Sequence, residues 1–228
     1  MKILGIAGSK RKKGNTAILL KEALQAAQNE GAKTELVFLD DYAITGCRGC
    51  EGCRENYKCV INDDMQKLYP LLLGSDGIIL GSPTYFYNIS ADMKAFLDRC
   101  YCFEVFDEKD RSCWVSINEA LGGKYAAVIA VCEQQNEKDM GFAPETMSLS
   151  LQALGYRVIE QVKVFNLFKA GAVFKDYDAL QRAGEAGKKL VKTIRLRKEL
   201  EDKIKVSYIQ GMGENSSGPA MSSFTITG

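Results

Sequence analysis

The stretch KILGIAGSKRKKGNTAILLKEALQAAQNEG, residues 2–31, gives the first indication of the fold. Residues 2–8 form a short apolar run that ends in glycine. Residues 15–31 place apolar side chains at helical spacing before a closing glycine. A strongly basic segment lies between them. The stretch therefore predicts a buried strand, a loop and an amphipathic helix, in that order.

Strands and helices alternate along the rest of the chain. An alternating pattern predicts a strand at 33–41, and apolar runs predict further strands at 76–83, 124–132 and 156–165. Helical patterns fall at 63–75, 90–101, 143–155 and 176–204. Parallel strands need crossover connections, so this alternation predicts an α/β fold, a doubly wound five-stranded parallel sheet with helices on both faces.

The domain organisation is expected to be simple. We expect one domain over 1–205 and a C-terminal tail over 206–228, because residues 211–228 are rich in glycine and serine. Such a tail is expected to be mobile or to dock on a neighbouring subunit. The connection at 102–123 is long, and long connections in compact domains often form lids or interface elements.

The composition excludes several functions. Lys and Arg number 30 against 29 Asp and Glu, so the formal net charge of +1 gives no overall field to attract nucleic acid or an anionic membrane. No apolar run approaches the roughly 18 residues of a membrane span, and the N-terminus lacks the order of a secretory signal, so we expect a cytoplasmic protein. The chain has no histidine, which excludes Ser-His and Cys-His nucleophile pairs. Reactive chemistry must then come from other side chains or a bound cofactor.

The loop GSKRKKGNT, residues 8–16, connects the first strand to the first helix. Such a loop presents unpaired backbone N–H groups and the positive end of the helix dipole, which suit a phosphate. Ser9, Asn15 and Thr16 add short donors, and Arg11 adds a charge-assisted one. The loop matches neither the Walker pattern nor the dinucleotide fingerprint. The alternative is a capped helix preceded by a solvated basic loop.

A second loop follows the third strand in GSPTYFYNISADMKAFLDR, residues 81–99. It lies at the carboxyl end of a strand, where ligands bind in open α/β sheets. Its aromatic side chains can stack on a planar ring, and Asn88 can form hydrogen bonds with the polar edge of such a ring. The alternative is that the three aromatic residues cover the edge of the core.

Four of the eight cysteines lie within GCRGCEGCRENYKCV, residues 46–60, with the spacing C-x2-C-x2-C-x5-C. Thiols stay reduced in the cytoplasm, so clustered cysteines there indicate metal or redox chemistry. Zinc sites usually join two separate C-x2-C pairs, whereas three consecutive cysteines at this spacing are typical of ligands to a four-iron four-sulfur cluster. Zinc and free or disulfide-bonded thiols are the alternatives. The candidate ligands are Cys47, Cys50, Cys53 and Cys59.

The other residues of this loop and the other cysteines carry expectations of their own. Gly46, Gly49 and Gly52 permit tight backbone turns around a cluster. We expect the four scattered cysteines to be small buried hydrophobic residues. These are Cys100, Cys102, Cys113 and Cys132.

The two loops resemble the phosphate loop and the isoalloxazine loop of the flavodoxin-like NAD(P)H-dependent FMN reductase superfamily, over about residues 1–165. Within that superfamily, the cysteine run resembles that of the iron-sulfur flavoproteins. The resemblance implies the strand order 2-1-3-4-5 and FMN bound by both loops. The implied phosphate contacts are Ser9, Arg11, Asn15 and Thr16. The implied ring contacts are Pro83, Thr84, Tyr85, Phe86 and Asn88.

The resemblance also implies an oligomeric assembly, but it does not settle the role of one loop. It implies a four-iron four-sulfur cluster close to FMN at a subunit interface, in a homodimer or homotetramer. Related reductases often carry a glycine-rich turn after the fourth strand, whereas this chain has AVCEQQNEKDMGF at 130–142. Contacts from that loop through Cys132, Glu133 or Gln134 are therefore left open.

Three functions fit these features. The first is an FMN-dependent oxidoreductase whose cluster passes electrons between a reduced donor, ferredoxin or NAD(P)H, and an acceptor. The second is an NAD(P)H-dependent FMN or quinone reductase without a cluster. The third is a flavodoxin-like electron carrier without turnover of its own. The absence of histidine agrees with chemistry carried by cofactors.

Overall fold

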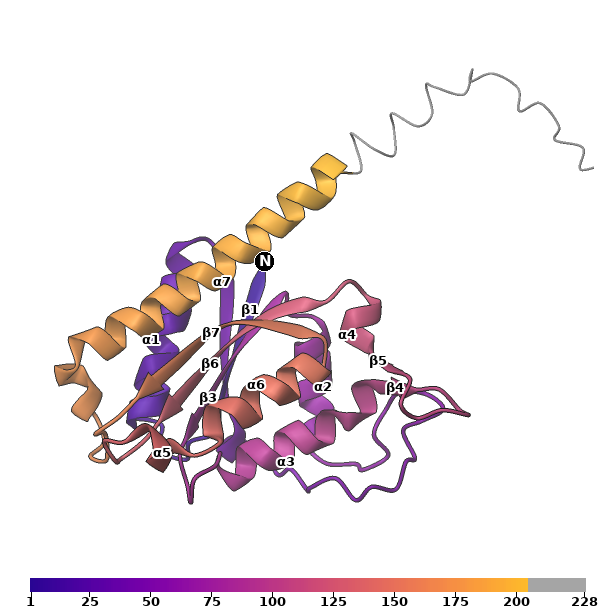
Figure 1. The fold of residues 1–228 in the computed structure, drawn as a ribbon, viewed down its shortest axis with the longest axis horizontal. Coiled ribbons are helices and arrows are strands. Elements are labelled where there is room, and N and C mark those ends of the chain that lie inside the picture. Colours follow the sequence, from indigo (N-terminus) through magenta and orange to yellow (C-terminus); the bar gives the residue numbers. More distant parts are fainter. Residues whose placement is uncertain (205–228) are drawn as a thin grey trace, which may run out of the picture. The chain divides into compact units, whose positions relative to one another are not determined.

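A five-stranded parallel sheet forms the centre of the computed structural model, which describes residues 1–204 (Figure 1). The order of the strands is β2-β1-β3-β6-β7, and every neighbouring pair is parallel. Counted along this sheet, the order is the predicted 2-1-3-4-5, so the flavodoxin-like doubly wound fold is confirmed. The strands are β1 (Lys2–Ala7), β2 (Lys33–Phe38), β3 (Gly77–Pro83), β6 (Lys124–Val131) and β7 (Tyr156–Val164).

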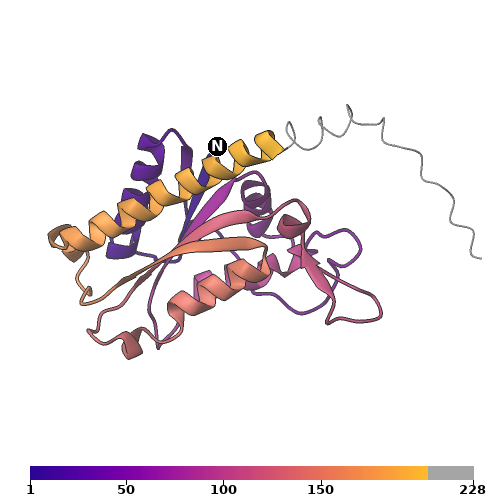
Figure 2. The same cartoon turned by 45° about the horizontal axis from the view of Figure 1, so that its top comes forward.

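Five longer helices cover the two faces of this sheet, and all five lie where the sequence predicts helices. Within residues 1–194, α1 and α7 lie on one face, and α2, α3 and α6 lie on the other (Figure 2). The helices are α1 (Asn15–Asn29), α2 (Met65–Leu73), α3 (Ala91–Arg99), α6 (Ala143–Ala153) and α7 (Tyr177–Ile204).

The sequence patterns did not predict several short helices and strands. The connection at 102–123 contains an antiparallel hairpin in which Phe106 of β4 packs against Trp114 of β5, with ring centroids 6.3 Å apart. Three-residue strands are too short to show a period, so pattern alone could not find them. The short elements are η1 (Leu39–Asp41), η2 (Cys100–Phe103), β4 (Glu104–Phe106), β5 (Trp114–Ser116), α4 (Ile117–Ala120), α5 (Glu137–Met140) and η3 (Ala172–Lys175).

Two hydrophobic cores lie on the two faces of the sheet. Leu4 and Ile6 of β1 point to the core under α2, α3 and α6, whereas Ile3 and Ala7 point to the core under α1 and α7. All four side chains are fully buried. Because both faces of the central strands are covered, these strands appear in the sequence as continuous apolar runs.

Residues 1–194 form one compact unit, and a second unit begins at Arg195, of which residues 195–204 are described. The expected tail at 206–228 lies outside the described residues, and the expected domain boundary near residue 205 stays a prediction. In the described part of the chain, no helix combines the length and the apolar character needed to cross a bilayer.

Helices α1 and α7 cross in direct backbone contact at Gly187. A Cβ atom added there would lie 1.9 Å from the carbonyl oxygen of Ala23, far inside contact distance. Gly184 lies one turn earlier on α7, and the nearest atom to a Cβ there is 3.7 Å away. Of these two glycines on α7, Gly187 alone is required by the packing.

We expect Gly187→Ala to lower the free energy of unfolding by about 2 kcal/mol, because the new methyl group overpacks the crossing. Gly184→Ala is the matched control on the same helix. It should leave stability unchanged or raise it by about 0.5–1 kcal/mol, because alanine favours helix. Urea unfolding followed by circular dichroism measures both. Equal stabilities for the two variants would contradict the close crossing.

Candidate functional site

The carboxyl ends of β1 and β3 meet at one rim of the sheet. The Gly8 N–H donates to the Gly81 carbonyl at 2.8 Å, which joins the two strand ends. Ser90 caps α3 by accepting a hydrogen bond from the Met93 N–H, and its hydroxyl donates to the Gly8 carbonyl at 2.6 Å. The loops after β1 and β3 therefore share one framework, as the parallel topology predicts.

The first loop leads directly into the N-terminus of α1. Gly14 is the residue before the helix, and within residues 1–204 no side chain caps it, so the first N–H groups of the helix lack intrahelical partners. Arg11 lies over the Phe168 ring, 5.3 Å from its centroid, and donates to the Phe168 carbonyl at 3.1 Å. Among the described residues, Arg11 pairs with no carboxylate. Its charge and the helix dipole both suit an anion.

Asn15 and Thr16 are buried in the first turn of α1. The Asn15 side chain donates to the Lys169 carbonyl at 3.1 Å and accepts from the Val173 N–H at 3.2 Å. It thereby ties the chain after β7 to the start of α1. Direct contact of Asn15 with a phosphate stays a prediction, and its observed contacts are structural.

The second loop turns sharply after β3. Tyr85 and Asn88 exchange two backbone hydrogen bonds, and the central residues Phe86 and Tyr87 have φ of 44° and 62°. Non-glycine residues rarely adopt this left-handed conformation, and such strain concentrates at functional sites. The turn also exposes its aromatic side chains, since Phe86 is 98% exposed. The alternative in which the aromatic residues cover the core is therefore wrong for Phe86.

Contacts from α6 and from the residue just before it hold this turn. The Phe142 N–H donates to the Tyr87 carbonyl at 2.7 Å, and the Thr146 hydroxyl donates to the Asn88 side-chain oxygen at 2.9 Å. The same oxygen accepts from the Ile89 N–H at 2.8 Å. The Asn88 oxygen is thus occupied by the protein, which leaves its amide nitrogen as the group that could reach a ligand.

The two loops enclose a cleft of about 120 Å³. Seven of the nine predicted contact residues line it, whereas Phe86 and Asn88 do not. Of the three residues considered for the loop after β6, Glu133 lines the cleft, whereas Cys132 and Gln134 do not. Leu167 and Phe168 were missed, because the segment after β7 shows no pattern. The lining residues are Ser9, Arg11, Gly14, Asn15, Thr16, Pro83, Thr84, Tyr85, Val131, Glu133, Leu167 and Phe168.

Thr84 carries an unused polar group at this cleft. Its backbone N–H donates to the Val131 carbonyl at 2.7 Å, which fixes the residue at the end of β3. Its hydroxyl oxygen is buried and has no hydrogen-bond partner within residues 1–204. Burying a hydroxyl without a partner costs roughly 1–3 kcal/mol, so this group is a candidate contact for a ligand or an ordered water in the cleft.

The four clustered cysteines lie on the loop between η1 and α2. Cys47 and Cys50 are exposed, whereas Cys53 and Cys59 are half-buried against the core. Burial and the neighbouring thiols raise the pKa of Cys53. Within residues 1–204, no three His, Cys, Asp or Glu side chains are arranged to hold a metal ion. The loop thus supplies four thiols as a donor set without showing a formed site.

The backbone of this loop differs from the expectation that its three glycines make the tight turns. Of the three glycines, only Gly49 has a left-handed φ, of 61°. Glu51 and Tyr57 adopt the same conformation, with φ of 54° and 57°, although neither is a glycine. The tight turns are therefore made partly by residues for which they are strained.

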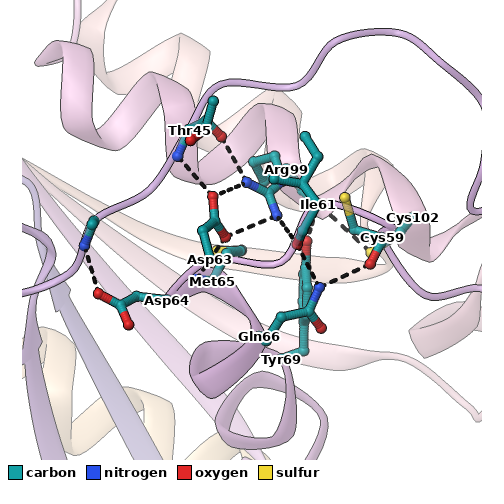
Figure 3. A network of polar contacts seen from close by, with 11 residues as sticks. Thr45, Cys59, Ile61, Asp63, Asp64, Met65, Gln66, Tyr69, Arg99 and Cys102 are labelled. Atoms are coloured by element: carbon teal, nitrogen blue, oxygen red, sulfur yellow. Dashed lines mark hydrogen bonds and ion pairs between the residues drawn. The ribbon is translucent and has the colours of Figure 1, made fainter.

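A buried ion pair closes the base of the cysteine loop (Figure 3). Arg99, at the end of α3, is 1% exposed and binds both carboxylate oxygens of Asp63, at 2.6 and 3.1 Å. It also donates to the carbonyl of Thr45 before the loop and to that of Ile61 after it, at 2.7 and 3.3 Å. Breaking a buried pair of this kind typically costs 3–5 kcal/mol, on the order of half of a domain's stability.

The hairpin β4–β5 and the cysteine loop line a second, larger cavity of about 720 Å³. Arg111 links the two segments, because it pairs with Glu51 at 2.9 Å and with the Tyr101 hydroxyl at 2.7 Å. Burial and the nearby Glu119 raise the pKa of Glu104, which lines the cavity, to about 7. Neither Glu104 nor Arg111 belongs to a motif from which sequence analysis could have predicted these contacts.

The scattered cysteines correct one expectation. Cys100, Cys102 and Cys132 are buried, as predicted. The prediction is wrong for Cys113, which is exposed in the turn between β4 and β5. Its thiol donates to the Asp110 carboxylate at 3.5 Å, and the hairpin places it away from both cores.

Sequence comparisons identify a matching family and similar proteins. The model of the NADPH-dependent FMN reductase family matches residues 1–143. An iron-sulfur flavoprotein of Methanosarcina thermophila is 30% identical over 206 residues, covering 89% of this chain and all of that protein. One from Methanocaldococcus jannaschii is 46% identical over 99 residues, covering 43% of this chain and 51% of that protein. This last match thus spans about half of the relative.

Structural comparisons agree on the fold. An archaeal flavodoxin superposes with a TM-score of 0.53 at 13% identity, covering 86% of this chain and 99% of that chain. An azoreductase from Bacillus anthracis superposes with a TM-score of 0.60 at 13% identity, covering 83% of this chain and 99% of that chain. At these identities the likeness shows the fold alone.

We expect Asp63→Asn to destabilise the protein by about 3 kcal/mol at neutral pH, because it leaves the Arg99 charge buried without a counter-charge. Burial alone would raise the pKa of Asp63, but hydrogen bonds from Arg99, Thr45 and Met65 outweigh it and hold this pKa below its ordinary 3.8. The carboxylate therefore stabilises the fold above its unfolded pKa, and this contribution is lost as the pH falls through the folded pKa.

The difference in unfolding free energy between wild type and Asp63→Asn should accordingly shrink below about pH 4. Urea unfolding at several pH values measures it. Asp178→Asn is the control, since Asp178 forms an exposed pair with Arg182, and it should change stability by less than about 0.5 kcal/mol. A difference for Asp63→Asn that is independent of pH would contradict this assignment.

Proposed function

Since the chain belongs to the NADPH-dependent FMN reductase family, whose members are FMN-dependent oxidoreductases, we propose that it transfers electrons through FMN and a four-iron four-sulfur cluster. FMN would occupy the cleft between the loops after β1 and β3. The cluster ligands would be Cys47, Cys50, Cys53 and Cys59. We propose NAD(P)H or ferredoxin as the electron donor and the cytoplasm as the location.

The unpaired Thr84 hydroxyl is the observation that carries the FMN assignment. It is a buried polar group at a cleft whose other wall offers the N-terminus of α1 and the unpaired charge of Arg11. Ser9 and Thr16 are buried beside it and would complete the phosphate end. A flavin mononucleotide combines an anionic phosphate with a hydrogen-bonding ring, so both ends of the cleft would find a partner.

The ring of FMN would lie against the turn at 84–88. Pro83, Thr84 and Tyr85 line the cleft, and the exposed Phe86 could pack on a ring from its rim. The Asn88 amide nitrogen would donate to the ring, because the Asn88 oxygen is occupied by Thr146 and Ile89. The strained turn would thus be held by the protein before the ring binds.

The chemistry of the donor set supports the cluster. Four thiols, without histidine, suit soft metals, and their consecutive x2 spacing favours a cubane over a single zinc ion. Eight similar proteins include seven named iron-sulfur flavoproteins. The ion pair at the base of the loop would keep these thiols next to the sheet.

The cofactors would supply electron-transfer chemistry, because flavin handles electrons in pairs or singly and a cluster handles them singly. The protein would bind, orient and separate them. The N-terminus of α1 would hold the phosphate, and the turn at 84–88 would orient the ring. Arg99 would fix the ends of the cysteine loop. None of these tasks requires an acid-base histidine.

We also propose that the chain forms a homodimer or homotetramer. Phe86, Tyr87 and Phe142 are exposed aromatic side chains on adjoining loops, joined by the hydrogen bond between Phe142 and Tyr87. A cluster of exposed aromatic residues commonly marks an interface. Sedimentation equilibrium should give a mass at least twice that of the chain, and a monomer at all concentrations would contradict the proposal.

Two substitutions should separate the two cofactors. Cys50→Ser should remove iron and sulfide from anaerobically purified protein and leave FMN bound, because it changes only the cluster ligands. Thr84→Val should weaken FMN binding about tenfold, the value of one hydrogen bond, and leave the iron content unchanged. Iron and sulfide analysis and fluorescence titration with FMN measure these effects.

Cys113→Ser is the matched control for Cys50→Ser, because Cys113 is also exposed but lies outside the cysteine loop. It should retain both iron and FMN. Stoichiometric zinc without iron in the wild type would replace the cluster proposal with a zinc site. Unchanged FMN affinity in Thr84→Val would contradict the placement of FMN in this cleft.

A further inference from the structure

Arg99 has one donor left after it closes the cysteine loop. Its two terminal nitrogens make four hydrogen bonds, to Asp63 and to the carbonyls of Thr45 and Ile61. Its fifth donor, the N–H at Nε, is buried and has no hydrogen-bond partner within residues 1–204. A buried charged group with an unused donor indicates a missing acceptor.

Cys59 lies beside this guanidinium (Figure 3). The Cys59 side chain interacts electrostatically with the guanidinium, so the thiol lies within reach of Arg99. The backbone of Cys59 is fixed independently, because the Gln66 side chain donates to its carbonyl at 2.8 Å. Gln66 also donates to the Ile61 carbonyl at 2.8 Å. The backbone of Cys59 is therefore anchored at the end of the loop that Arg99 closes.

We infer that the Nε–H of Arg99 donates a hydrogen bond to the sulfur of Cys59 when that sulfur is a cluster ligand. Arg99 is then a positioning residue that also sets the potential of the cluster. The inference rests on the proposed function, because it takes Cys59 as a ligand. A hydrogen bond and a positive charge at a ligand sulfur stabilise the more negative, reduced form of a cluster.

Arg99→Lys tests this hydrogen bond in the whole, anaerobically loaded protein. Lysine keeps the charge but lacks the fork and the Nε–H. We expect iron content to be retained and the equilibrium ratio of reduced to oxidised cluster to fall about tenfold at a fixed potential. This fold-change equals a shift of about 59 mV for a one-electron couple. An unchanged potential in folded, iron-loaded Arg99→Lys would overturn the inference.

Trypsin cleavage of the metal-free protein gives a second readout that does not depend on the cluster. Arg48, Arg54 and Lys58 are exposed cleavage sites within the loop. Because Arg99 holds both ends of this loop, we expect cleavage at these sites, followed by mass spectrometry, to be about tenfold faster in Arg99→Lys. Should that variant fail to fold, Asp63→Asn provides the same readout, since it frees one side of the clamp. Cleavage at the wild-type rate in the folded variant tested would overturn the positioning role.

Arg111→Lys is the matched control. Arg111 also contacts the loop, through Glu51 at 2.9 Å, but its side chain is exposed. It should change neither the potential nor the cleavage rate, and effects equal to those of Arg99→Lys would overturn the inference. If the wild type contains no iron but Arg99→Lys speeds cleavage of the loop, the cluster proposal is contradicted and the positioning role of Arg99 is supported. If the wild type contains iron but Arg99→Lys leaves the potential of the cluster unchanged, the inference is contradicted and the cluster proposal is supported.

Discussion

Parallel pairing of β1 with its two neighbours is the constraint on which the rest of the structure depends. Every parallel neighbour must be reached by a crossover, so the loops after β1, β3 and β6 all emerge at the same rim. The cleft arises there because three loops far apart in the sequence become adjacent. The hydrogen bond from Gly8 to Gly81 shows how directly the strand pairing continues into the loops.

The cysteine loop needs a different kind of support, because it lies outside the sheet. A long surface loop with four thiols has little apolar surface of its own to bury. One buried arginine compensates by binding the carbonyls of Thr45 and Ile61 and the carboxylate of Asp63. The loop thus combines two exposed thiols, those of Cys47 and Cys50, with a base that a buried ion pair joins to the end of α3.

Much of this arrangement could be predicted from the sequence. The central strands β1, β3 and β6 were found because both of their faces are buried and their apolar runs are continuous. The cleft residues were found because they follow strand ends. The hairpin β4–β5 was not found, since its strands are too short for a period. Phe168 and Glu104 were missed for another reason, because their roles depend on tertiary contacts. The same applies to Arg99, because nothing in the sequence near the end of the predicted helix indicates its contacts with Thr45, Ile61 and Asp63.

Helix α3 connects the two regions of the molecule that the proposed cofactors would occupy. Its first turn is anchored to the rim of the cleft through Ser90, and its last residue is Arg99 at the base of the cysteine loop. Nine residues of helix span roughly 13 Å. The length of α3 therefore sets the distance between the rim of the cleft and the base of the cysteine loop. Inserting or deleting a single residue in α3 would rotate Arg99 by about 100° about the helix axis, away from the cysteine loop. We therefore expect related proteins with the same clamp to keep the length of α3, even where the lengths of nearby loops differ.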